Sequence, residues 1–182
     1  MNRSAIVVTA LALSATLFAP SAHADDTIKH PGDHPNYVVE IEPHLIVGWY
    51  RSVGVGARFN FALMKNGPIP SINNNLALGV GAELQFLGYT QRVRGYYFRE
   101  GGAFLSVPVT MQWNFFVHER WSVFPELGVA FNHGFYDCEG ACGGPIFVDI
   151  VGAVGARYHF SESTALTFRA GYPGITVGLS FF

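Results

Sequence analysis

Residues 167–182 read TFRAGYPGITVGLSFF and contain two runs of alternating apolar residues around a Pro-Gly pair. The apolar positions are Phe168, Ala170, Tyr172, Ile175, Val177, Leu179 and Phe181. A period of two is typical of a β-strand with one apolar and one polar face. Arg169 lies on the polar face, opposite Gly178 if Pro173 and Gly174 form a two-residue turn. The fold depends on which of the two faces is enclosed.

The same alternation extends over most of the chain, and no segment after Tyr37 has helical periodicity. It predicts eight strands, at 37–48, 51–63, 75–87, 103–116, 120–132, 146–160, 164–172 and 174–182. One face of each strand carries apolar side chains and no charged residue. The other face is polar and rich in glycine, and its ionisable residues include Glu40, Glu42, His44, Arg58, Glu83, Glu126, Asp149, Arg157 and Arg169.

Two architectures produce this alternation. In a soluble barrel, such as a lipocalin-like carrier of apolar ligands, the apolar face is the core, whereas in a membrane barrel it meets lipid and the polar face lines the interior. An eight-stranded barrel has an interior only wide enough to be filled by side chains, and the apolar set is too large for it. Glycines on the polar face suit a narrow interior. We therefore predict an all-β fold, a closed eight-stranded antiparallel up-and-down transmembrane β-barrel.

Composition and the N-terminus agree with export to a membrane. Of the 182 residues 49% are hydrophobic and only 13% are charged, which is little for a soluble surface. The 11 basic and 13 acidic residues nearly balance, so a nucleic-acid partner is not expected. The basic start MNR, the run AIVVTALALSATLFA and the site SAHA predict a signal peptide at residues 1–24. The run is too short for a membrane-spanning helix.

Residues 25–36, DDTIKHPGDHPN, have no periodicity and contain two prolines and a glycine. They predict a flexible N-terminal segment before a barrel domain at 37–182. His30 and His34 can bind a metal ion only loosely there, and a solvated tail is the simpler interpretation.

Cys138 and Cys142, in CEGAC, are the two cysteines of the chain. In an oxidising compartment they predict a disulfide that closes a small loop. A metal site is the alternative, but two thiolates need two more ligands, for which His133 and Asp137 are the nearby candidates.

The connections predict which barrel end faces outward. With a periplasmic N-terminus, the short turns HER and SES are periplasmic, and the long GYTQRVRGYYFREGG and NHGFYDCEGACGGP lie outside, as in outer-membrane barrels. The connection KNGPIPSINNN is a longer periplasmic one. Pro43, Pro108 and Pro125 cannot donate to a strand ladder, so we expect bulges or locally broken pairing at these prolines.

The signal peptide together with SVPVTMQW (106–113), FPELGVAF (124–131) and GITVGLSFF (174–182) resembles the small OmpA/OmpX-like outer-membrane β-barrels of Gram-negative bacteria. The resemblance implies a monomer in the cell outer membrane without a cofactor, in contact with membrane lipid and lipopolysaccharide. It also implies that the barrel-assembly machinery recognises the terminal strand. Here the alternation is in phase with Phe181 rather than with the terminal Phe182.

The interior residues predict a salt-bridged network that fills the lumen. A first hairpin that turns at WYR sets Glu42 opposite Arg58. Glu83, Glu126 and Asp149 would meet Arg157 or Arg169, because charges in a poorly hydrated lumen are costly unless paired. A narrow or gated pore is the alternative function.

A lipid-modifying enzyme is a second alternative, because some barrels of this size are lipid A deacylases with a His-x-Ser motif. His159 and Ser161 match it, but His159 points into the predicted barrel and Ser161 lies in a periplasmic turn. We therefore expect no enzymatic activity.

The outer connection RVRGYYFRE concentrates arginine and aromatic residues: Arg92, Arg94, Tyr96, Tyr97 and Arg99. Guanidinium groups suit phosphate, which lipopolysaccharide supplies. A structural or surface-interaction role at the cell envelope is the predicted function.

Overall fold

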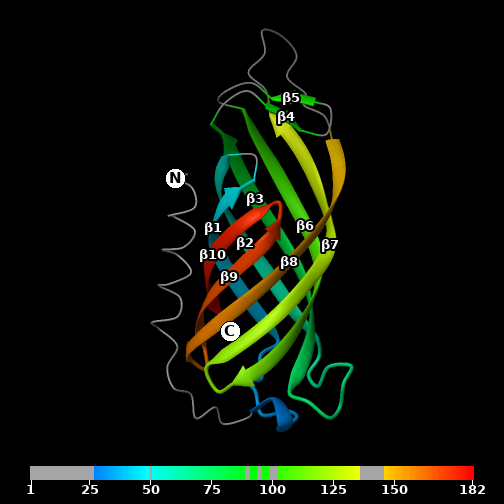
Figure 1. The fold of residues 1–182 in the computed structure, drawn as a ribbon, viewed down its shortest axis with the longest axis vertical. Coiled ribbons are helices and arrows are strands. Elements are labelled where there is room, and N and C mark those ends of the chain that lie inside the picture. The colour runs from blue at the N-terminus through cyan, green and yellow to red at the C-terminus, as the bar shows by residue number, and fades with distance from the viewer. Residues whose placement is uncertain (1–26, 50, 89–90, 94–95, 99–101, 136–145) are drawn as a thin grey trace, which may run out of the picture.

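Eight long strands close on themselves into one barrel (Figure 1). The computed structural model describes residues 27–49, 51–88, 91–93, 96–98, 102–135 and 146–182. The barrel strands are β1 (Val39–Gly48), β2 (Ser52–Met64), β3 (Asn74–Leu87), β6 (Ala103–His118), β7 (Trp121–Phe135), β8 (Ile146–Ser161), β9 (Thr164–Tyr172) and β10 (Gly174–Phe181). The eight predicted strands are confirmed, each end within three residues.

Every barrel strand is antiparallel to both of its neighbours, in the order β1-β10-β9-β8-β7-β6-β3-β2. The last strand therefore pairs with the first, and the sheet has no edge along this ring. Two short strands, β4 (Gln91–Val93) and β5 (Tyr96–Phe98), form a separate hairpin in the connection between β3 and β6. The sequence pattern did not predict this hairpin.

The barrel is apolar outside and polar inside. Outward side chains such as Leu45 and Leu127 are 64% and 65% exposed, whereas the inward Glu40 and Glu42 are 0% exposed. Extended strands place successive side chains on opposite faces, so the alternation in the sequence becomes this inversion of an ordinary protein core. Among the described residues, no helix has the length and apolar character needed to cross a membrane.

The three strand prolines interrupt one ladder each without shifting its register. At Pro43 the ladder of β1 with β10 passes from Ile41↔Phe181 directly to His44↔Gly178. Pro108 and Pro125 have the same kind of gap, towards β3 and towards β6 respectively. The expected broken pairing is thus confirmed, since proline has no N–H to donate. The register shifts lie at the ends of β2, β6 and β8 and not at the prolines.

The terminal hairpin differs from the prediction by one ladder step. Ala170 pairs with Ile175, and Arg169 faces Thr176 rather than Gly178. The turn is therefore centred on Tyr172 and Pro173, not on Pro173 and Gly174. The short β10 is held by β1 on its other side, and that ladder, with Gly48 opposite Gly174, determines where β10 begins.

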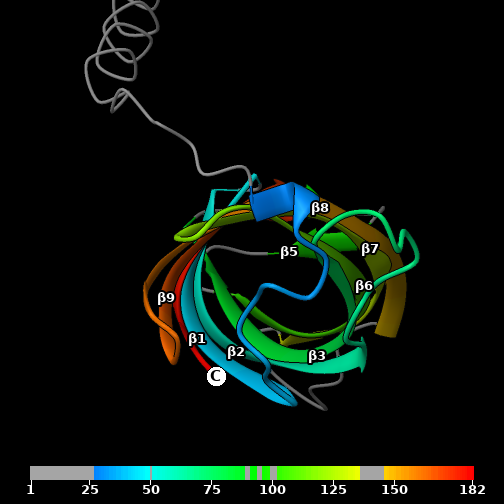
Figure 2. The ribbon, with the colours of Figure 1, turned by 90° about the horizontal axis from the view of Figure 1, so that it is seen from below.

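Residues 27–38, which we call the strap, lie across one mouth of the barrel. Figure 2, seen from below, shows this N-terminal segment in blue crossing the opening. It begins with the short 3₁₀ helix η1 (Thr27–Lys29) and leads into β1. We call this end, where the β2–β3, β6–β7 and β8–β9 connections also lie, the lower end. The sequence suggested a flexible, solvated tail, whereas residues 27–36 make specific side-chain and backbone contacts with the barrel.

Candidate functional site: the barrel interior

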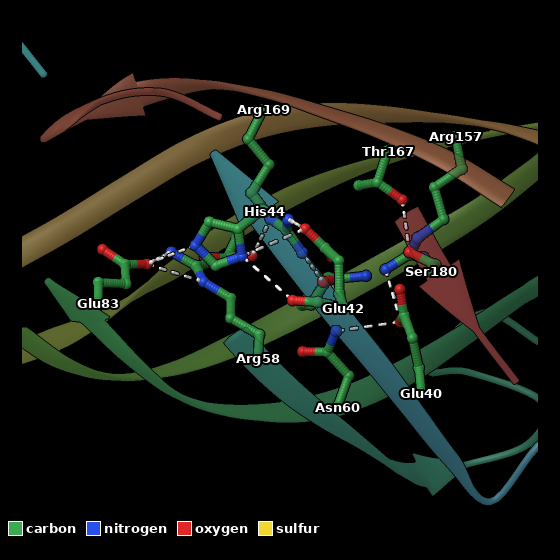
Figure 3. A network of polar contacts seen from close by, with 12 residues as sticks. Glu40, Glu42, His44, Arg58, Asn60, Glu83, Arg157, Thr167, Arg169 and Ser180 are labelled. Atoms are coloured by element: carbon green, nitrogen blue, oxygen red, sulfur yellow. Dashed lines mark hydrogen bonds and ion pairs between the residues drawn. The ribbon is translucent and has the colours of Figure 1, made fainter. Parts of the chain in front are cut away.

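Two arginines and three glutamates from five strands form one cluster in the lumen. Figure 3 labels four of them, Glu42, Arg58, Glu83 and Arg169. Arg58 donates through Nε and Nη2 to Glu83 Oε1, at 3.2 and 2.9 Å, and through Nη1 to Glu126. Arg169 donates through Nε to Glu126 Oε2 at 3.0 Å and through Nη1 to Glu42. All five side chains are at least nine-tenths buried. We call these residues the upper cluster.

His44 lies beside the upper cluster on β1. Its Nε2 is 3.5 Å from Glu83 Oε1, and its Nδ1 is 3.8 Å from Glu42 Oε1. The same Nδ1 lies 3.2 Å from the backbone oxygen of Glu42. The imidazole therefore bridges two acidic side chains that come from β1 and β3.

A second group, the lower cluster, is built around Arg157. Its Nη2 donates to Glu40 Oε2 at 2.7 Å, and its Nη1 donates to Asn114 Oδ1 at 2.7 Å. Asn60 Nδ2 also donates to Glu40 Oε2, at 3.0 Å. Asn114 in turn donates to Asn75 Oδ1 at 2.6 Å. The charge-assisted bonds of Glu40 and Arg157 connect β1, β2, β6 and β8 inside the lumen, and the amide bond from Asn114 to Asn75 adds β3.

Phe124 contacts the arginines of both clusters. Its ring centroid is 4.6 Å from the Arg157 guanidinium carbon and 5.1 Å from that of Arg169, within cation–π range. The ring is 1% exposed and points inward from β7. Gly155 faces it on β8, and a Cβ there would lie 2.2 Å from a ring carbon. A glycine is needed at this position because the aromatic ring occupies the space.

Little free space remains between these side chains. The cavity beside Arg58, Glu83, Glu126 and Arg169 leaves about 10 Å³ for the centre of a water molecule. The buried side chains of the upper cluster therefore leave a small space beside them.

The predicted interior residues all lie inside the barrel, but their partners are only partly those expected. Glu42 does face Arg58 in the β1–β2 ladder. Its bonded partner is nevertheless Arg169 on β9, which is separated from β1 by β10. Asp149 accepts from the Tyr172 hydroxyl at 3.2 Å.

The residues predicted for surface contact are described only in part, and the two cysteines are not described. Arg92, Tyr96 and Tyr97 belong to the β4–β5 hairpin, where Arg92 pairs with Tyr97 and Val93 with Tyr96. Arg94, Arg99, Cys138 and Cys142 lie outside the described residues, so the disulfide stays a prediction.

Asn60, Asn75 and Asn114 are uncharged members of the network that the sequence did not assign to it, although Asn60 and Asn114 lie on the predicted polar face. The parity of Asn60, Asn75 and Asn114 along their strands directs each side chain into the barrel. Asn60 lies two residues after Arg58, and Asn114 lies two residues after Gln112. Phe124 was also missed, although it has the same phase as Glu126 and interrupts an otherwise polar face. An aromatic residue on the polar face was the available signal for a lumen-filling ring.

The His-x-Ser pair is not assembled into a site. His159 points inward, 6% exposed, with Nε2 3.1 Å from Ser122 Oγ. Its ring stacks on Phe182 at 5.5 Å. Ser161 Oγ instead lies 3.2 Å from Ser163 Oγ in the exposed β8–β9 turn. His159 therefore serves the interior packing, and Ser161 faces the turn.

No protein-family model and no curated protein matches the sequence. In structure, the chain is similar to one from the de novo design of transmembrane β-barrels, with 15% identity, a TM-score of 0.51, and 85% of this chain and 98% of that one covered. Neisserial surface protein A is similar at 10% identity and a TM-score of 0.49, covering 79% and 93%. Ail, the attachment invasion locus protein of Yersinia pestis, is similar at 11% and 0.44, covering 78% and 90%.

At these identities the likeness concerns the fold alone. The match to the designed barrel, together with the apolar exterior and charged interior, defines the class: the fold is that of a closed eight-stranded transmembrane β-barrel. The predicted fold class is confirmed.

Replacing Arg169 with methionine should destabilise the barrel strongly. The change leaves buried Glu42 without its guanidinium partner, and breaking a buried ion pair costs about 3–5 kcal/mol. Thermal unfolding of the purified protein in detergent, followed by gel mobility with and without heating, measures the loss. Arg120→Met is the matched control, because Arg120 is exposed in the β6–β7 turn. Equal stability of the two variants would contradict the importance of the network.

Proposed function

We propose that this protein is an exported outer-membrane β-barrel with a structural or surface-interaction role and a lumen closed by its polar network. The observation that carries the proposal is the inverted barrel: exposed aliphatic and aromatic side chains outside, and buried paired charges inside. In water the exposed apolar exterior would be unfavourable. In a membrane the same exterior contacts hydrocarbon, and the charged residues stay paired inside the barrel.

Strand length and aromatic placement support insertion into a membrane. The strands β2, β3, β6, β7 and β8 have 13 to 16 residues, and a tilted strand spans the hydrocarbon with roughly 9–11. Near the lower end Trp121 packs on Tyr158 at 5.1 Å, and Tyr158 on Phe160 at 5.4 Å. Trp49 projects from the opposite end, where its indole N–H donates to the Gly171 carbonyl. Aromatic side chains at both ends are typical of membrane interfaces.

A charge at mid-height on the outer surface separates a membrane barrel from a soluble one. Leu127→Arg, in the middle of β7, should cost about 2–4 kcal/mol in lipid and reduce the folded, heat-modifiable form in the membrane fraction. Leu63→Arg is the matched control, because Leu63 is also exposed but lies near the lower end of β2, where the cost falls to about 0–1 kcal/mol. A soluble barrel would tolerate both changes and would be released without detergent.

The closed lumen is supported by the upper cluster and its remaining space of about 10 Å³. We expect the purified protein in planar bilayers to give no discrete conductance steps in 1 M potassium chloride, because the path is blocked by paired side chains. Reproducible steps from the unmodified protein would favour the alternative of a narrow pore.

We propose no enzymatic activity for this protein. His159 hydrogen-bonds Ser122 within the interior, whereas Ser161 lies with Ser163 in the lower turn. A deacylase would need these groups near the outer leaflet, and the lower end is the periplasmic one in the proposed orientation.

Surface interaction is the role proposed for the upper end, with lipopolysaccharide phosphate as the partner chemistry. Three arginines in one ten-residue stretch support it. Changing Arg92, Arg94 and Arg99 to serine should weaken binding of the detergent-solubilised protein to lipopolysaccharide at least tenfold, measured at two salt concentrations. Changing Lys29, Lys65 and Arg120 at the lower end to serine also removes three positive charges. This variant should bind lipopolysaccharide as the parent does. Equal binding by both triple variants would remove the support for this role.

A further inference from the structure

The strap is fastened to the barrel by side-chain bonds and by a backbone bond from Asn73, rather than by a strand ladder. At its start, Thr27 Oγ1 donates to the Phe116 carbonyl at 3.3 Å. Asn73, just before β3, then holds two points along it: its backbone N–H donates to the Ile28 carbonyl at 2.7 Å, and its Nδ2 to the Asp33 carbonyl at 2.7 Å. Asn73 is fully buried. These bonds attach the strap to the wall formed by β3 and β6.

The middle of the strap covers an inward-facing aromatic ring. His34 stacks on Phe116 with a centroid distance of 4.6 Å and an angle of 9° between the rings. Its Nε2 lies 2.8 Å from the Lys65 carbonyl in the β2–β3 connection. Phe116 is 4% exposed although it lies two residues before the end of β6, at the lower mouth. The strap thus covers a ring that would otherwise border an open mouth.

The end of the strap joins the interior network. Tyr37 packs on Phe182 at 4.6 Å, and its hydroxyl accepts from Asn75 Nδ2 at 3.4 Å. Asn75 accepts from Asn114, which binds Arg157. Burial raises the pKa of the Tyr37 hydroxyl, as expected where water is excluded. The strap is therefore continuous with the lower cluster.

We infer that the strap is a lid that seals the lower mouth and keeps water from the lower cluster, independently of the closure made by the upper cluster. Glu40 and Arg157 are 0% and 1% exposed, although they lie nearer the lower mouth than the upper cluster does. Ser122, still nearer that mouth, is also 0% exposed. The upper cluster cannot shield these residues from below, so their burial requires a cover at the lower end.

The attachment also makes the lid separable from the wall. Before β1 begins, the backbone bond that continues the barrel ladder is Ala62 N–H to Val38 O, at 3.0 Å. The other contacts of residues 27–37 described above involve side chains or a loop. The strap can therefore leave the mouth without breaking a pair in the eight-stranded ladder.

Thiol accessibility tests this inference in the intact barrel. A single reporter, Ser122→Cys, is placed in a background with Cys138 and Cys142 changed to serine, and is treated with a small charged methanethiosulfonate reagent. The strap is weakened by the double change His34→Ala and Asn73→Ala, which removes the ring stack and one side-chain anchor. We expect the reporter to react at least tenfold faster in that variant. His30→Ala is the matched control, because His30 is exposed in the strap, and it should leave the rate unchanged.

A second reporter and a second variant complete the test. Ser106→Cys lies on β6 in the upper half of the lumen, where it faces Glu83 in the ladder, and its rate should not respond to the strap. Deleting residues 25–36 removes the lid outright and should also expose Ser122→Cys. Heat-modifiable gel mobility shows that each variant is folded. Fast reaction of Ser122→Cys in the parent would contradict the lid. So would protection of Ser122→Cys both in the His34→Ala, Asn73→Ala variant and in the deletion variant. Conductance of the variant that lacks residues 25–36 tests the closure by the upper cluster separately, because that variant has no lid.

Discussion

The structure depends on the pairing of three guanidinium groups inside a space too narrow for bulk water. Arg58, Arg157 and Arg169 are each within hydrogen-bond distance of at least one glutamate, and all are at least 95% buried. Buried ion pairs add little net stability compared with apolar packing, but an unpaired member is very costly. The network therefore acts mainly as a constraint: it admits the strand arrangement in which every charge finds its partner and disfavours others. Its bonds connect strands on opposite sides of the barrel, which adjacent-strand pairing cannot do.

The shape of the wall follows from this filled interior. Glycines face the lumen where large side chains need room, as Gly155 does beneath Phe124. The bulky apolar residues then have no place inside and form the outer surface, so interior electrostatics and exterior apolarity are two consequences of one narrow cross-section. The two ends of the barrel must also be covered, because an open mouth would admit water to the buried charges. At the lower end the strap and the aromatic rings of Phe116, Tyr37 and Phe182 occupy that position.

Much of the fold could be predicted because alternation is a local property. The eight strand ranges and the inward phase of every predicted ionisable residue follow from a period of two. The opposition of Glu42 and Arg58 was predictable too, since a short turn sets the register of its hairpin. The partners were not: Glu42 binds Arg169, 127 positions away, because closure of the barrel brings β9 within side-chain reach of β1. The β9–β10 register was also missed, since both Thr176 and Gly178 have the phase of Arg169 and parity cannot distinguish them.

The sequence by itself determined which residues face lipid-like surroundings and which face the interior, because side-chain direction in an extended chain depends only on position parity. It also determined the number of strands and the places where proline interrupts a ladder. Only the tertiary structure decided which charge meets which, that Phe124 lies against two arginines, and that residues 27–38 cover a mouth instead of trailing from it. These features arise on closure of the barrel, which brings distant strands within side-chain reach and has no signature in any single segment.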